Sequence, residues 1–127
     1  MPSAILTGTG MYVPPRVVKN DDLKEWYDTS DEWITERSGI KERRWIEEGT
    51  NTSDLAVEAA NEALKNSGLG KDELHMVVFA TLTPDAYFPG SGCFLQAKME
   101  LPTIPCLDIR MQCSGFIYGL SLAEMYI

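Results

Sequence analysis

The stretch LHMVVFAT, residues 74–81, decides the fold, because a run of consecutive apolar residues, 76–80, stands at its centre. A continuous apolar run this short is typical of a strand that is covered on both faces, as in a parallel sheet. Residues 104–109 predict a second strand, and residues 90–101 between them predict a helix. Strand, helix and strand in this order indicate an α/β fold with a mixed, largely parallel sheet.

Helical patterns on either side of these strands extend the alternation. Small and apolar residues recur at i, i+4 spacing over residues 55–64, and Gly68 ends this helix. Either Thr52 or Ser53 is expected to cap its amino end. Residues 114–127 predict a last helix after the second strand.

The amino-terminal part of the chain predicts shorter elements. Thr29 and Glu32 form a capping box, so a helix is expected to begin at Thr29 and to end at Gly39. The other expected elements are a strand over residues 4–9, a brief helix over residues 21–27 with Asn20 as its N-cap, and a polar, edge-like strand over residues 41–47.

Gly8-Thr9-Gly10 follows the first expected strand and has two of the three glycines of a dinucleotide-binding turn. The third glycine is absent, and Pro14-Pro15 stands where the phosphate-binding helix would run. We therefore interpret the segment as a tight turn that leaves a strand.

Composition limits the classes of function. The 127 residues amount to about one domain, and eleven basic against nineteen acidic residues give a net charge of −8. This charge argues against a nucleic-acid partner and against adsorption to an anionic membrane. The sequence has neither an apolar run long enough to span a membrane nor the start of a signal peptide. Three cysteines at irregular spacing suggest reduced thiols in the cytoplasm and no metal site.

Cys113 is the strongest candidate for a catalytic residue. It stands where the second apolar strand gives way to the last helix, and a helix amino terminus favours the thiolate. Gly115 and Gly119 are expected to let that helix approach a neighbour closely. A buried, inert cysteine is the alternative interpretation, and it is preferred for Cys93 and Cys106.

Two further features carry possible chemistry. Trp33 and Arg37 are four residues apart, so a flat ring and a guanidinium share one helix face and could bind a flat anionic ligand. A cation–π pair at the surface is the alternative. His75, the single histidine, opens a strand and is interpreted as a structural or surface residue.

Two motifs together resemble a known family. The run DTSDEWI, residues 28–34, is followed by Arg37-x-Gly39-Ile40, and this closely resembles the early signature of beta-ketoacyl-acyl-carrier-protein synthase III. These condensing enzymes start bacterial fatty-acid synthesis. The segment Cys113-Ser-Gly-Phe116 resembles their nucleophile segment, and the likeness covers almost the whole chain.

The resemblance implies a thiolase-like fold, in which two similar halves form α-β-α-β-α layers. Residues 1–127 would be the N-terminal half-domain that carries the nucleophile, and the C-terminal half would be absent from this chain. Cys113 would take an acyl group from acetyl-coenzyme A or another short acyl-coenzyme A. Phe88 matches a residue that in relatives reaches across a dimer interface toward the partner's acyl pocket.

Coenzyme A and the second substrate would be bound as in that family. Trp33 would stack on the adenine, Arg37 would meet the phosphates, and Thr29 would hydrogen-bond nearby. The acylated enzyme would condense with malonyl-acyl-carrier protein, with a histidine and an asparagine of the missing half stabilising the enolate. A homodimer is expected, and no cofactor, because acyl-coenzyme A is a substrate.

Two alternatives remain open. Met111-Gln112 precede the cysteine where many members of the family carry small residues, which allows a related condensing enzyme of secondary metabolism with a longer or aromatic primer. The chain could also act alone as a non-catalytic, dimerising or ligand-binding half-domain. We expect the isolated chain to be inactive and prone to aggregation.

Overall fold

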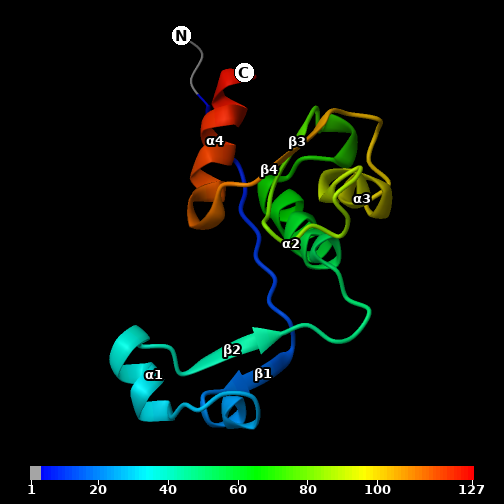
Figure 1. The fold of residues 1–127 in the computed structure, drawn as a ribbon. Helices are drawn as coiled ribbons and strands as arrows, with labels where there is room; N and C mark the ends of the chain where they lie inside the picture. Colours follow the sequence, from blue (N-terminus) through cyan, green and yellow to red (C-terminus); the bar gives the residue numbers. More distant parts are fainter. Residues whose placement is uncertain (1–3) are drawn as a thin grey trace. The chain divides into compact units, whose positions relative to one another are not determined.

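The computed structural model describes residues 4–127 and divides the chain into two compact units (Figure 1). The first unit consists of Met1–Tyr12 and Asn51–Ile127, and the second is Val13–Thr50. Residues 1–3, which begin the segment searched for a signal peptide, lie outside the described residues. No helix among residues 4–127 is both long and apolar enough to cross a membrane.

A parallel strand pair forms the centre of the first unit. β3 (Val77–Ala80) pairs with β4 (Cys106–Ile109), and Val77 lies opposite Cys106. The two predicted strands and their parallel direction are confirmed, although each strand is shorter than predicted. The 3-10 turn η2 (Lys71–Glu73) occupies the residues before β3.

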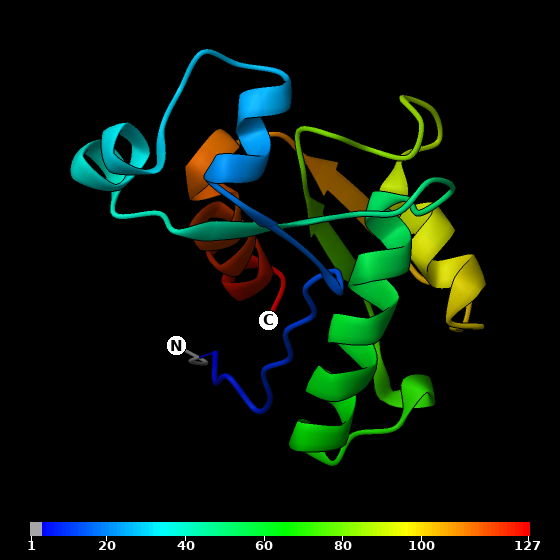
Figure 2. The same ribbon diagram turned by 90° about the horizontal axis from the view of Figure 1, so that it is seen from below.

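Two helices cover one face of this strand pair. α2 (Thr52–Ser67) and α3 (Ser91–Lys98) lie side by side there (Figures 1 and 2). Phe79 points toward them and forms the buried core with Leu95 and Met99 of the α3 region. The apolar stripe of α2 packs against this core, so its small residues bring the helix close to the strands.

The last helix, α4 (Gly115–Met125), covers the other face. A Cβ added at Gly115 would stand 3.1 Å from the Cβ of Ala80, and one at Gly119 would stand 3.7 Å from Val78. Because alternate strand residues face opposite sides, Val78 and Ala80 face α4 while Phe79 faces α2 and α3. The predicted covering of both strand faces is confirmed, as is the close approach at Gly115.

The second unit contains an antiparallel strand pair and two short helices. β1 (Arg16–Lys19) pairs with β2 (Glu42–Trp45), which confirms the predicted polar strand. Between them lie the 3-10 helix η1 (Asp21–Glu25) and α1 (Asp31–Ser38). Gly39 ends α1 with a φ of 71°, as its position predicted.

The predicted helix caps need correction at two helices. Ser30, not Thr29, caps α1 and accepts a hydrogen bond of 3.1 Å from the backbone N–H of Trp33. Asn51, not Thr52 or Ser53, is the N-cap of α2. The hydroxyls of Thr52 and Ser53 bond instead to the loop after β3, and this long-range demand overrides the local pattern.

Asn20 occupies the N-cap position of η1, as predicted, but its side chain makes no capping hydrogen bond there. Its side chain is 1% exposed and lies at the centre of the second unit. The amide nitrogen donates to Asp31 Oδ1 at 2.8 Å and to the carbonyl of Ile40 at 2.7 Å, while the amide oxygen accepts from Arg43 at 2.7 Å. Tertiary contacts therefore hold the side chain that the sequence pattern assigned to a local turn.

The segment over residues 4–9 is extended but is not a strand, because its polar groups bond to α2 rather than to a neighbouring strand. The carbonyl of Thr9 accepts from Asn66 at 2.8 Å. A Cβ at Gly8 would stand 2.4 Å from the carbonyl oxygen of Ala63, and one at Gly10 would be closer still to α2. The interpretation of these glycines as a tight turn is therefore wrong: they allow the backbone to contact a helix.

Candidate functional site

Cys113 lies in a short turn between a strand and a helix. β4 ends at Ile109, the 3-10 turn η3 (Gln112–Ser114) follows, and α4 begins at Gly115. The thiol is free and exposed to solvent. The predicted place of Cys113 at the start of a helix is confirmed, whereas its role as a nucleophile stays a prediction.

Two backbone features shape this turn. Gln112 has a φ of 45°, in the left-handed region that side chains rarely adopt. Gly115 is buried against Ala80 of β3, so a larger residue there would push the start of α4 away from the strand. Cys113 is thus placed between a strained backbone position and a closely packed one.

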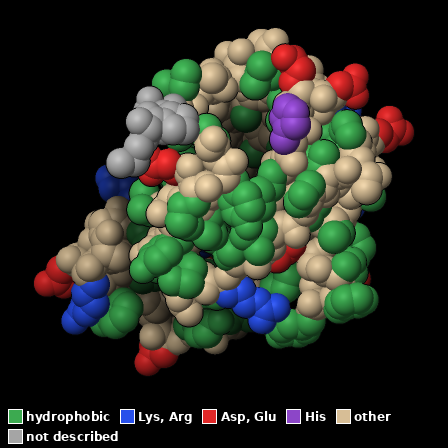
Figure 3. Space-filling model, turned by 90° about the horizontal axis from the view of Figure 1, so that it is seen from above, with side chains coloured by type: hydrophobic (Ala, Val, Ile, Leu, Met, Phe, Trp, Pro, Cys, Tyr) green, Lys and Arg blue, Asp and Glu red, His purple; other side chains and the backbone are tan. Residues whose placement is uncertain are grey.

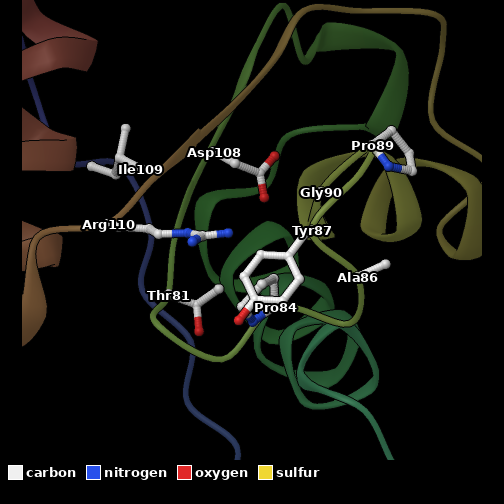
Figure 4. A pocket seen from close by; sticks show the side chains of 9 residues that line it. All are labelled: Thr81, Pro84, Ala86, Tyr87, Pro89, Gly90, Asp108, Ile109 and Arg110. Atoms are coloured by element: carbon white, nitrogen blue, oxygen red, sulfur yellow. The ribbon is translucent and has the colours of Figure 1, made fainter.

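A cavity of about 180 Å³ lies between the end of β4 and the loop that follows β3 (Figure 4). In it the guanidinium carbon of Arg110 stands 4.8 Å from the ring centre of Tyr87. This cation–π contact joins the segment that leads to Cys113 with the loop that carries Phe88. The lining residues are Thr81, Pro84, Ala86, Tyr87, Pro89, Gly90, Asp108, Ile109 and Arg110.

Asp108 of β4 connects this cavity to the start of α3. Its carboxylate oxygens accept from the backbone N–H of Gly92 at 3.1 and 3.2 Å. A Cβ at Gly90 or Gly92 would stand 2.8 Å from carboxylate atoms of Asp108, so glycine is needed at both positions. Sequence reasoning missed this contact, since no local pattern links an aspartate to glycines so far along the chain.

Phe88 and Tyr87 project from the loop after β3. Their exposed fractions are 89% and 84%, so neither ring belongs to the core of this chain. Exposure of this kind is typical of aromatic residues at an interaction surface. The place of Phe88 at a dimer interface remains a prediction.

Trp33 and Arg37 meet on α1 of the second unit. The guanidinium carbon of Arg37 lies 4.5 Å from the Trp33 ring centre, and the ring is 54% exposed. Arg37 also forms an ion pair of 3.8 Å with Glu36. The predicted shared face is confirmed, and the stacked pair leaves a flat aromatic and cationic surface open to solvent.

Thr29 lies just before α1 and carries an unpaired hydroxyl. Its Oγ1 is buried and has no hydrogen-bond partner among residues 4–127. An unpaired buried hydroxyl costs free energy, so such groups usually have a function or a partner elsewhere.

The other two thiols lie in α3 and β4 and are less exposed than Cys113. Cys106 is partly buried, and burial raises the pKa of its thiol, with a further contribution from the neighbouring Cys93. His75 is exposed (Figure 3), in agreement with its interpretation as a surface residue. Within residues 4–127 no group of three His, Cys, Asp or Glu side chains could hold a metal ion.

Comparison with known proteins shows that the chain is strongly similar to one part of several longer proteins. No family model matches the chain. The chain is 46% identical over 98% of its length to beta-ketoacyl-acyl-carrier-protein synthase III of Caldanaerobacter subterraneus subsp. tengcongensis, and spans 38% of that relative.

Solved structures show the same relation. The crystal structure of 3-oxoacyl-acyl-carrier-protein synthase III from Aquifex aeolicus aligns with a TM-score of 0.90 at 45% identity, over 98% of this chain and 40% of that one. The priming beta-ketosynthase of the R1128 polyketide pathway aligns with a TM-score of 0.88 at 30% identity, over 94% of this chain and 36% of that one.

These similarities define a thiolase-like α/β protein, as the sequence predicted. Over almost its whole length the chain is similar to beta-ketoacyl-acyl-carrier-protein synthase III, and it spans well under half the length of the relatives that it matches.

Proposed function

We propose that the protein acts as an acyltransferase of the condensing type, in which Cys113 carries the acyl group. The observation that carries this proposal is the exposed thiol at the turn from β4 to α4, in a chain similar to this family. The first half-reaction is acyl transfer, and the second is a decarboxylative condensation that starts fatty-acid synthesis.

In the first half-reaction the Cys113 thiolate attacks the thioester carbonyl of an acyl-coenzyme A. The new carbon–sulfur bond forms, the bond to the coenzyme sulfur breaks, and free coenzyme A leaves with a proton. The backbone N–H of Cys113, near the amino end of α4, would stabilise the negative oxygen of the tetrahedral intermediate. Acetyl is the acyl group proposed.

In the second half-reaction malonyl-acyl-carrier protein loses carbon dioxide, and the resulting enolate carbon attacks the acyl carbonyl. The product is a 3-ketoacyl-acyl-carrier protein, and the Cys113 thiolate is expelled and takes up a proton. A histidine and an asparagine outside this chain would stabilise the enolate. No cofactor takes part in either step.

The second unit would bind coenzyme A. The exposed Trp33 ring would stack on adenine and the Arg37 guanidinium would pair with phosphate oxygens, which the stacked geometry supports. The hydroxyl of Thr29 would find its missing hydrogen-bond partner nearby in the bound complex. Phe88 would complete the acyl pocket of a partner in a cytoplasmic homodimer.

The test is acylation of Cys113 in the full-length protein. Intact-mass measurement after brief incubation with acetyl-coenzyme A should show a gain of one acetyl group. Cys113→Ala should abolish the gain, whereas Cys93→Ala should leave it in place because that thiol lies in α3. Acetylation that persists in Cys113→Ala would overturn the proposal.

A second candidate differs only in the primer. Met111 and Gln112 before the cysteine, together with the similarity to a priming beta-ketosynthase of polyketide synthesis, favour a condensing enzyme of secondary metabolism. The two candidate functions can be distinguished by comparing acetyl-, branched-chain and long-chain acyl-coenzyme A as primers. No acyl gain with any primer would favour the non-catalytic alternative.

A further inference from the structure

A buried polar cluster, made of Ser53, Asp85, Ser91 and Lys98, lies outside the proposed catalytic residues. Ser53 and Ser91 are completely buried, and the side chain of Asp85 is 6% exposed. Burying a carboxylate costs free energy unless hydrogen bonds and a counter-charge compensate it. A charged group in this position therefore needs a reason beyond packing.

Every contact of Asp85 in this cluster joins separate elements. The backbone N–H of Ser53, at the start of α2, donates to Oδ1 at 2.9 Å, and the Ser53 hydroxyl donates to Oδ2. The hydroxyl of Ser91, at the start of α3, donates to Oδ1 at 2.9 Å and accepts from the Asp85 N–H at 2.9 Å. The ammonium of Lys98 stands 3.7 Å from Oδ2.

The hydrogen bonds of Asp85 thus connect the loop over residues 81–90 to the amino ends of α2 and α3. A second attachment is the hydrogen bond from the Thr52 hydroxyl to the carbonyl of Thr83. Phe88 lies three residues beyond Asp85 and, being almost fully exposed, has no packing of its own that fixes its ring. The place of that ring depends on the loop, and the loop depends on the Asp85 contacts.

We propose that Asp85 is a positioning residue that determines primer specificity by holding the loop of Phe88 in place. This inference rests on the proposed function, because it assigns the length of the accepted acyl chain to the position of the Phe88 ring. Asp85 itself would touch no substrate. Both oxygens and the negative charge of its carboxylate are needed to hold the loop, since Ser53 and Ser91 both donate to it and the Lys98 ammonium faces it.

The first arm of the test measures the loop without any substrate. Hydrogen exchange in full-length Asp85→Asn should be faster over residues 81–91 and the first turn of α2, and unchanged over β4 and α4. Asp54→Asn is the matched control, because the Asp54 carboxylate also bonds Lys98, at 2.5 Å, but its hydrogen bonds go to Lys98 and the Asn51 N–H rather than to the loop. Uniformly faster exchange over the whole first unit would show a general structural role and overturn the proposal.

The second arm measures the ratio of Cys113 acylation rates between acetyl-coenzyme A and a longer acyl-coenzyme A. We expect Asp85→Asn to change this ratio about tenfold, the low end of what one methylene of fit gives in an apolar pocket. In a Phe88→Ala background the same substitution should change nothing further, since its effect runs through Phe88. An equal loss of both rates would contradict positioning.

Two outcomes remain distinct. If the wild-type protein acylates Cys113 with no primer, the proposed function fails, and the exchange arm still decides whether Asp85 holds the loop. If Asp85→Asn does not fold, Ser91→Ala removes one donor and leaves Lys98 in place. Ser91→Ala should change the hydrogen exchange of the loop and the ratio of acylation rates in the same direction as Asp85→Asn, but by a smaller factor. If neither quantity changes, the inference is wrong.

Discussion

At the scale of single residues, Asn20 shows how one amide organises the second unit. It bonds to a helix, to the residue that leads into β2, and to an arginine of β2, all from a buried position. Asn20→Ala would remove one hydrogen-bond partner each from the Arg43 guanidinium, the Asp31 carboxylate and the Ile40 carbonyl.

We expect Asn20→Ala to lower the free energy of unfolding by about 1–3 kcal/mol, the cost of leaving buried polar groups unsatisfied. Denaturant unfolding measures this difference. Asn61→Ala is the control, because Asn61 is exposed on α2, and its effect should stay within about 0.5 kcal/mol. Equal effects of the two substitutions would contradict the role of Asn20.

The three thiols should also differ in reactivity. Cys113 is exposed, whereas burial first, and the nearby Cys93 second, raise the pKa of Cys106. A raised pKa means less thiolate at a given pH, so iodoacetamide at pH 8 should modify Cys113 well before Cys106. Peptide mapping after timed quenching reads the order, and earlier modification of Cys106 would contradict it.

At the scale of elements, the contact of the amino-terminal segment with α2 depends on glycine. A Cβ at Gly10 would stand 2.0 Å from the carbonyl oxygen of Ala59, a distance that only movement of the segment can relieve. That movement would also break the 2.6 Å hydrogen bond from the Met11 N–H to Glu62.

Gly10→Ala should therefore destabilise the protein by about 1–3 kcal/mol, as overpacking does. Thermal unfolding checks this. Gly70→Ala is a matched control, because its added Cβ would meet only a Glu73 oxygen at 3.5 Å and its φ of −82° suits alanine. If Gly10→Ala were as well tolerated as Gly70→Ala, the close contact with α2 would be refuted.

Elements with strong local patterns could be predicted from the sequence, and those set by distant contacts could not. The run at residues 76–80 identified β3, and Gly39 and Gly68 marked the ends of α1 and α2. Residues 4–9 have the composition of a strand, yet within residues 4–127 no strand pairs with them, and they lie along a helix instead.

In the candidate site, too, features set by local sequence could be predicted and features set by distant contacts could not. The position of Cys113 follows from strand, turn and helix in sequence, and the pairing of Trp33 with Arg37 follows from helical spacing. The contact of Arg110 with Tyr87 joins residues more than twenty positions apart, so no local sequence pattern predicts it.

At the scale of the whole molecule, two aspartates couple stability to pH. The hydrogen bond from Lys98 lowers the pKa of Asp54, and the Asn51 N–H adds to this. Burial raises the pKa of Asp85, but hydrogen bonds from Ser53 and Ser91 outweigh it, so that pKa is also lowered. Both carboxylates are therefore stabilised in their charged form by folding.

The direction of the pH dependence follows from the difference between the folded-state and unfolded-state pKa values. A lowered folded-state pKa adds stability above the ordinary value of 3.8, and this stability is lost as the pH falls through the folded-state values. The free energy of unfolding should thus decrease as the pH falls from about 5 to below 3.8, and Asp54→Asn should make the decrease shallower. Equal slopes in the variant and the wild type would contradict this coupling.

The chain order of the two units has a consequence for how such proteins diverge. Val13–Thr50 is inserted between two segments that together build the first unit, which carries Cys113. Trp33 and Arg37 belong to the insertion. An insertion can be exchanged or resized while the strand order of its host stays the same. Selection can therefore alter the surface of Trp33 and Arg37 independently of the turn that carries Cys113.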